Sequence, residues 1–136
     1  YNVSVKFLDN IYKIATKYDW DIYLKTKRGI DLNYHNKLYK IFFDEFSQKK
    51  NVFIVNANTS PVRLINYTNS SISIPFTSTS LIAKYYKKPT CYYDPISILD
   101  TSDRAAQGIK LICGSLELED WFLRNSSMID DNFYNN

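Results

Sequence analysis

Residues 71–93, SISIPFTSTSLIAKYYKKPTCYY, contain the strand, helix and strand that decide the fold. Residues 71–74 read as a brief strand that Pro75 stops, because proline has no N–H to donate to a sheet ladder. The hydroxyl-rich run 77–80 opens a helix, since Ser and Thr are favoured at helix starts. Residues 90–93 form the next strand. A strand, a helix and a second strand at this spacing predict a parallel pair joined by a crossover helix.

The same alternation extends in both directions along the chain. Further helices are predicted where apolar side chains recur at helical spacing, at residues 4–18 and 34–46 and from 115 to the start of the polar tail at 125. Ser60-Pro61, a capping hydroxyl followed by proline, predicts a short helix at 62–67. Further strands are predicted where apolar residues run together: residues 21–27, 52–55 and 110–113. The run 52–55 is continuously apolar, which is typical of a strand covered on both faces. Residues 94–108 read as a long loop, a length that suggests function.

This order predicts an α/β protein. We expect a Rossmann-like three-layer sandwich around a mostly parallel five-stranded sheet, with right-handed crossovers and helices on both faces. The domain is assigned to residues 1–124, and residues 125–136 to a polar tail. Because ligands bind beyond the carboxyl ends of the strands in such sheets, the functional edge is expected at four segments: residues 25–29, 56–60, 74–80 and 94–108.

Composition excludes several classes of protein. The 136 residues suffice for one domain with a core, and 45% hydrophobic residues are too many for a disordered chain. Three glycines cannot supply a dinucleotide-binding fingerprint or a P-loop. One histidine, His35, and two cysteines are too few for the usual structural zinc sites, and we expect no metal. Cys91 and Cys113 lie in apolar runs, which favours buried thiols in a reducing compartment.

The ends and the charge of the chain carry two further expectations. The chain begins at Tyr1 rather than a methionine, which we interpret as a piece of a longer protein. The net charge of +3 is mild. Lys49-Lys50 and Lys87-Lys88 each close a predicted helix, where cations favour the helix dipole, so we expect solvated helix ends and no nucleic-acid partner.

The run Thr77-Ser78-Thr79-Ser80 is the leading candidate for a binding site. Four consecutive hydroxyls at a helix start, together with unpaired backbone N–H groups and the positive end of the dipole, suit a phosphate. The alternative is that Thr77 or Ser78 simply caps the helix. One hydroxyl suffices for a cap, so four in a row favour the ligand.

Charged residues follow two other predicted strands on the same edge. Lys25, Lys27 and Arg28 end the first strand, where they could neutralise a diphosphate, or equally form a solvated loop. Asp94 follows the fourth strand and could accept a hydrogen bond from a ribose or sugar hydroxyl, although Asp-Pro also opens ordinary turns. Asp103 and Arg104 lie in the same predicted loop and complete a candidate nucleotide- and sugar-binding group. His35 is more typical of a surface or capping residue than of a catalytic base.

Several of these segments also resemble a known family. The resemblance is carried by ISIPFTSTSLIAK at 72–84, Lys88-Pro89, YYDP at 92–95 and DRAAQGI at 103–109. They look like the C-terminal half of bacterial surface-polysaccharide biosynthesis glycosyltransferases of the two-domain GT-B type. The basic residues 25–28 are similar in position to a basic strand end of capsule and teichoic-acid polymer transferases. The family's histidine is missing there, and no glutamate in residues 94–104 is placed to hold a ribose, so the donor type stays open.

The resemblance implies a C-terminal domain that binds a nucleotide-sugar donor through the hydroxyl run and the basic strand end. It implies no cofactor and no metal, and an acceptor-binding N-terminal domain as the missing partner and the source of the catalytic base. The fragment alone would then be inactive. We expect a cytoplasmic location, with peripheral association at the inner face of the membrane as one form of it. A non-catalytic Rossmann-like interaction module and a sugar-nucleotide epimerase-like domain remain as alternatives.

Overall fold

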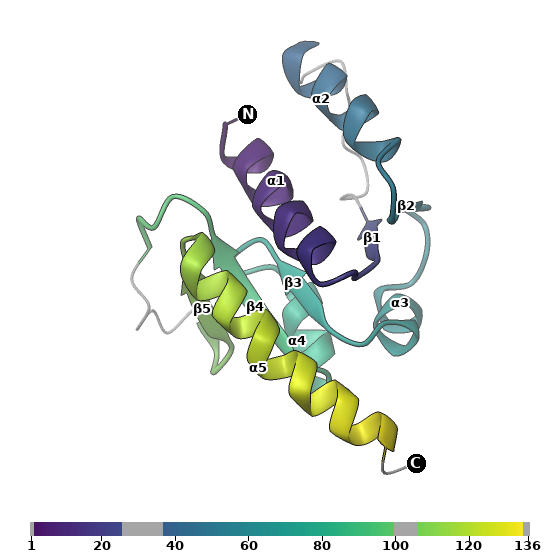
Figure 1. The fold of residues 1–136 in the computed structure, drawn as a ribbon, viewed down its shortest axis with the longest axis vertical. Helices are drawn as coiled ribbons and strands as arrows, with labels where there is room; N and C mark the ends of the chain where they lie inside the picture. The colour runs from purple at the N-terminus through teal and green to yellow at the C-terminus, as the bar shows by residue number, and fades with distance from the viewer. Residues whose placement is uncertain (1, 26–36, 100–105, 135–136) are drawn as a thin grey trace. The chain divides into compact units, whose positions relative to one another are not determined.

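The computed structural model describes residues 2–25, 37–99 and 106–134, which contain five helices alternating with five parallel strands (Figure 1). The predicted α/β class is therefore confirmed. The backbone falls into two compact units, Tyr1–Thr59 and Ser60–Asn136, and each is described by itself. None of the helices in the described residues combines the length and the apolar character that a membrane span requires.

The first unit has two helices and a two-stranded parallel sheet. Its elements in chain order are α1 (Asn2–Lys17), β1 (Ile22–Lys25), α2 (Lys37–Ser47) and β2 (Val52–Val55). In the sheet Ile22 lies opposite Val52, and Tyr23 stacks on Phe53 with ring centroids 5.1 Å apart. Helix α2 contributes the buried Phe46, whose ring meets Tyr12 of α1 edge-on at 5.8 Å.

Strand β2 is less covered than its sequence predicts. Phe53 and Ile54 are 47% and 45% exposed, so the expectation of a strand covered on both faces is wrong. The physical reason lies in the two-stranded sheet. The ring of Phe53 stacks on the cross-strand ring of Tyr23, and such a pair shields only one side of each ring.

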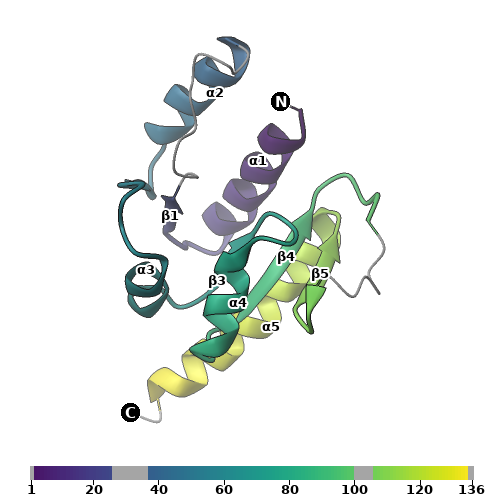
Figure 2. The same ribbon diagram turned by 180° about the vertical axis from the view of Figure 1, so that it is seen from behind.

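The second unit has a three-stranded parallel sheet with the order β3-β4-β5. Its elements in chain order are α3 (Pro61–Tyr67), β3 (Ser71–Ser73), α4 (Ser78–Tyr85), β4 (Thr90–Asp94), β5 (Lys110–Cys113) and α5 (Ser115–Tyr134). Helix α4 packs on β3 and β4, whereas α5 packs on β5 from the opposite face (Figures 1 and 2). The unit is therefore a small three-layer sandwich with β4 as its central strand.

The core of this unit follows the two-residue period of the strands. On one face Tyr92 and Leu111 lie in register and pack with Ala106 and Ile109. On the other face Tyr93 and Ile112 lie in register, and both are fully buried. Helix α5 adds its own buried residues Leu118, Trp121 and Phe122 at helical spacing. All five residues of β4 are buried or half-buried, as expected for the middle strand of a parallel sheet.

The predicted single sheet of five strands is not observed among the described residues. The strands form one sheet of two and another of three, and β1 pairs with β2 alone. Strand β3, at the edge of the larger sheet, has only three residues, two of them serines. So short a strand offers few ladder hydrogen bonds to a second neighbour.

The C-terminal helix is longer than the sequence predicts. Helix α5 reaches Tyr134, past Asn125 where we expected a polar tail to begin. Asn125 Nδ2 donates to the carbonyl of Trp121 at 2.8 Å, and Arg124 pairs with Asp120 at 2.9 Å. Both contacts join residues one helical turn apart, and such pairs support a helix at its polar positions.

The buried thiol of Cys91 in β4 makes folding sensitive to alkaline pH. Cys91 is 0% exposed, and burial raises the pKa of its thiol, more than nearby Lys110 lowers it. Above about pH 8.5, the ordinary thiol pKa, the unfolded chain loses a proton that the folded chain keeps. We therefore expect the free energy of unfolding to fall by up to about 1.4 kcal/mol per pH unit above that pH.

Urea denaturation between pH 7.5 and pH 9.5 measures this slope. Cys91→Ala, which has no thiol to titrate at this position, is the control and should show a shallower decline. Equal slopes in the two proteins would contradict the assignment.

Candidate functional site: the turn before helix α4

The candidate site lies where the three strands of the second unit end. Parallel strands bring their carboxyl ends to one edge of a sheet, so Ser73, Asp94 and Cys113 mark this edge. Helix α4 begins shortly after β3, and α5 begins directly after β5. Two helix N-termini and the loop after β4 therefore follow from the same edge. Of the four segments expected at one edge, residues 74–80 and 94–108 follow strands of this sheet, whereas 25–29 and 56–60 follow the two strands of the other sheet.

A strained turn connects β3 to α4. The N–H of Thr77 donates to the carbonyl of Ile74 at 3.3 Å, which closes a four-residue turn with Pro75 in its second position. Phe76 in the third position has φ +67°. This is the geometry of a type II turn, whose third position favours glycine. A bulky side chain there costs about 1–2 kcal/mol, so the surrounding contacts must hold the turn in place.

Tyr92 of β4 supplies those contacts. The ring of Phe76 meets the ring of Tyr92 edge-on, with centroids 5.7 Å apart. The hydroxyl of Tyr92 donates to the carbonyl of Thr77 at 3.0 Å. Tyr92 is 1% exposed and therefore fixed in the core. One buried side chain thus sets the conformation of the turn and the point at which α4 begins.

The first turn of α4 has no side-chain cap. Thr77 is the N-cap residue, but its hydroxyl donates to the carbonyl of Ile74 at 2.9 Å. No side chain in the described part of the chain accepts a hydrogen bond as a cap of this helix. The first N–H groups of a helix have no acceptor within it. The structure therefore does not bear out the simple capping alternative for Thr77, and the first turn of α4 contains no acidic residue.

The four hydroxyls of the run 77–80 do not all face the same way. Ser80 is 0% exposed; it donates to the carbonyl of Cys91 at 3.3 Å and accepts from Thr90 at 3.0 Å. Its hydroxyl also shares a short hydrogen bond with that of Ser73. Ser80 therefore anchors α4 to both neighbouring strands. Ser78 is exposed and Thr79 is half-buried, which leaves these two hydroxyls for a ligand.

Asp94 is buried in the loop that it begins. The residue is 3% exposed, and one carboxylate oxygen accepts from the N–H of Ile96 at 3.1 Å. The other oxygen accepts from the N–H groups of Ile98 and Leu99, both at 2.9 Å. The carboxylate therefore holds the start of the loop, and its predicted hydrogen bond to a sugar hydroxyl stays a prediction.

The remaining predicted residues lie in the other unit or outside the described residues, and their place at this site stays a prediction. Lys25 is half-buried and ends β1 in the other unit. The other predicted charged residues and the single histidine lie outside the described residues: Lys27, Arg28, Asp103, Arg104 and His35. Sequence reasoning missed Phe76 and Tyr92 as parts of the site. Pro75 signals a turn, but nothing in the sequence marks the left-handed conformation of the residue after it.

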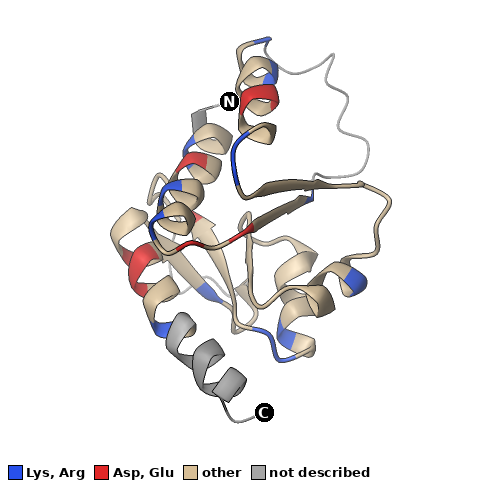
Figure 3. Cartoon of the chain, turned by 45° about the vertical axis from the view of Figure 1, so that its right-hand side comes forward, with Lys and Arg blue, Asp and Glu red and all other residues tan. Residues whose placement is uncertain are grey.

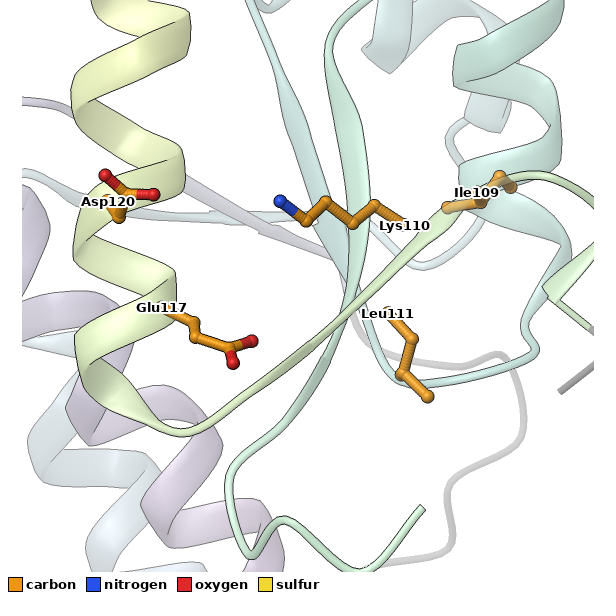
Figure 4. A pocket seen from close by; sticks show the side chains of 5 residues that line it. All are labelled: Ile109, Lys110, Leu111, Glu117 and Asp120. Carbon is orange, nitrogen blue, oxygen red and sulfur yellow. The ribbon is translucent and has the colours of Figure 1, made fainter. Parts of the chain in front are cut away.

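A separate open hollow of about 490 Å³ lies between β5 and α5 (Figure 4). In Figure 4 the side chain of Lys110 points from the strand toward the helix, where Glu117 and Asp120 stand. Glu117 accepts a hydrogen bond from the N–H of Cys113 at 3.2 Å. Burial raises the pKa of the Cys113 thiol, and the charges of Asp94 and Glu117 raise it further. Two carboxylates beside one lysine make this hollow less suited to a phosphate than the start of α4.

Metal-binding side chains do not gather in the described residues. No group of three or more His, Cys, Asp or Glu residues is arranged there to hold an ion.

Replacing Asp94 tests its place in the loop. Asp94→Asn puts an amide group where an oxygen accepts a backbone N–H, so a part-buried donor loses its partner. We expect the free energy of unfolding to fall by about 1–3 kcal/mol. Asp120→Asn is the matched control, since it breaks only an exposed pair with Arg124, and should change stability by less than about 1 kcal/mol. Urea denaturation of both variants measures the difference, and equal effects would contradict the role of Asp94.

Residues 1–122 match a family model described as "Polysaccharide biosynthesis PFTS motif protein". The letters Pro-Phe-Thr-Ser occur once in the chain, at residues 75–78. They cover the strained turn, the N-cap and the first residue of α4. Comparison with curated proteins and with solved structures gave no match.

Proposed function

Because the chain belongs to the polysaccharide biosynthesis PFTS motif family and so has a role in polysaccharide biosynthesis, we propose that it binds a nucleotide-activated sugar at residues 75–79. We call these residues the PFTS site. The diphosphate of the donor contacts the start of α4 there. In this proposal the chain is the donor-binding part of a glycosyltransferase of the two-domain GT-B type.

The uncapped start of α4 is the observation that carries the proposal. Thr77, the residue placed to cap the helix, turns its hydroxyl back to Ile74. Backbone N–H groups and the dipole then favour an anion at this point. The hydroxyls of Ser78 and Thr79 add donors suited to phosphate oxygens. Position adds support, because this turn follows the carboxyl end of a parallel strand, where α/β proteins bind their ligands.

The same groups suit the chemistry of sugar transfer. When the sugar leaves its donor, negative charge develops on the departing diphosphate. Fixed N–H dipoles aimed at that charge stabilise the transition state more than the ground state. The positive end of α4 can supply this stabilisation without a metal ion. We further propose that Lys25, Lys27 and Arg28 add positive charge, that Asp103 and Arg104 contact the nucleotide or sugar, and that the catalytic base comes from an acceptor-binding domain.

One observation favours a different function, a non-catalytic interaction module. Phe53 and Ile54 of β2 leave apolar surface exposed in the first unit, as do Leu38 and Ile41 of α2. Apolar surface of this kind is typical of protein contacts. Such a module, however, has no need of an uncapped helix start. Nucleotide binding distinguishes the two functions.

Calorimetric titration of the 136-residue chain with UDP, CMP and GDP tests the proposal. We expect at least one of the three to bind. The double variant Ser78→Ala, Thr79→Val removes two donors to a charged group and should weaken that binding roughly tenfold or more. Ser80 is left intact, because its hydroxyl holds the helix on the sheet.

The matched control is Thr59→Val, Ser60→Ala, which removes the same two kinds of hydroxyl before α3. It should leave nucleotide affinity unchanged. If none of the three nucleotides binds, or if both double variants lose affinity equally, the phosphate assignment is wrong.

A further inference from the structure

We propose that the end of α4 is a docking surface for an anionic phospholipid bilayer. The surface, which we call the amino-edge patch, consists of six residues: Tyr67, Lys84, Tyr85, Tyr86, Lys87 and Lys88. It lies at the opposite end of α4 from the PFTS site, so it is independent of the proposed nucleotide binding.

The patch is brought together at the amino edge of the sheet. Tyr67 ends α3, and the chain enters β3 four residues later. The N–H of Ser71 donates to the carbonyl of Pro89 at 2.9 Å, which ties this entry to the turn after α4. Helices α3 and α4 also pack against each other. Residues distant in sequence therefore share one end of the second unit.

The segment of sequence that carries the patch has charge of one sign. Between Glu45 and Asp94 the sequence contains no aspartate or glutamate, while it contains three lysines within residues 84–88. In Figure 3 α4 and the turn after it carry basic positions and no acidic ones. The amino group of Lys84 donates a 3.1 Å hydrogen bond to the carbonyl of Gln107. This acceptor is neutral, so the bond does not cancel the charge of the lysine.

Aromatic side chains stand out beside these lysines. Tyr85 is 79% exposed, Tyr67 is 71% exposed and Tyr86 is 39% exposed. Such exposure leaves the rings open to solvent rather than enclosed by neighbouring side chains. Tyrosine is favoured at the membrane interface, where its ring meets the acyl boundary and its hydroxyl stays among the headgroups. Lysines beside it are attracted to anionic lipids. The combination favours a bilayer over a single-stranded polymer, which calls for a groove that tracks the strand.

Lys87 occupies a position that folding alone would give to glycine. The φ of Lys87 is +59°. The N–H of Lys87 donates to the carbonyl of Lys84 at 3.0 Å, and the N–H of Lys88 donates to the carbonyl of Ala83 at 2.9 Å. This is the Schellman arrangement, in which the left-handed residue is most often glycine. Lys87→Gly should therefore stabilise the fold while it removes a charge from the patch. This one substitution is therefore expected to raise the stability of the fold and to weaken binding to the bilayer.

Co-sedimentation of the 136-residue chain with lipid vesicles tests the proposal. We expect binding to vesicles of phosphatidylcholine with phosphatidylglycerol, weak binding to phosphatidylcholine alone, and a loss of binding as salt rises. Lys87→Gly should weaken binding roughly fivefold and raise the melting temperature, and addition of Lys88→Gln should bring the loss to roughly twentyfold. Tyr85→Ser should weaken binding further. Arg124→Gln, the same charge change at an exposed pair on α5, is the control and should have little effect.

Four results would overturn the proposal. The first two are a failure to bind anionic vesicles and equal binding to anionic and neutral vesicles. The third is an equal loss of vesicle affinity in Lys87→Gly and Arg124→Gln. The fourth is that the chain binds a single-stranded oligonucleotide more tightly than vesicles, and that the oligonucleotide binding also depends on Lys87 and Lys88. None of these results depends on whether a nucleotide binds at the PFTS site.

Discussion

The hydroxyl of Ser80 is the contact on which the second unit depends. It lies with no exposed surface between the side chains of Ser73 and Thr90 and the carbonyl of Cys91. These partners come from two strands, while Ser80 itself belongs to α4. The helix is thereby held in one position over the edge of the sheet. A polar group so deeply buried is tolerated because its hydrogen-bonding capacity is filled. The start of α4, and with it the candidate site, follows from this anchor.

The segment around this anchor serves two purposes at once. Ser80 and Tyr92 face inward and fix the helix and the turn. Ser78 is exposed and Thr79 is half-buried at the start of the same helix. The inward contacts hold Phe76 in a conformation that its side chain disfavours. The proposed diphosphate site would require rigid support of this kind, because dipoles that stabilise a developing charge must already point in the right direction.

Much of the local structure could be predicted from the sequence. The strand expected at 71–74 is observed as Ser71–Ser73, and the helix expected from residue 77 is observed as Ser78–Tyr85. These predictions succeed because proline, hydroxyl caps and apolar periodicity act over a few neighbouring residues. The predictions that failed concern longer distances. The exposure of Phe53 and the separation into two sheets depend on which elements meet in space, and periodicity does not record that.

The candidate site shows the same division between local and tertiary information. By itself the sequence determined that a hydroxyl-rich helix start follows a short strand, and that the chain alternates helices with parallel strands. Only the tertiary structure decided which hydroxyls are available. The hydroxyl of Ser80 is hydrogen-bonded to Thr90 and Cys91, ten and eleven residues away, and the carboxylate of Asp94 is hydrogen-bonded within its own loop. The side chains of serine and aspartate can form the same hydrogen bonds with a ligand as with their own chain. The choice between the two is made by the partners that folding brings within hydrogen-bond distance.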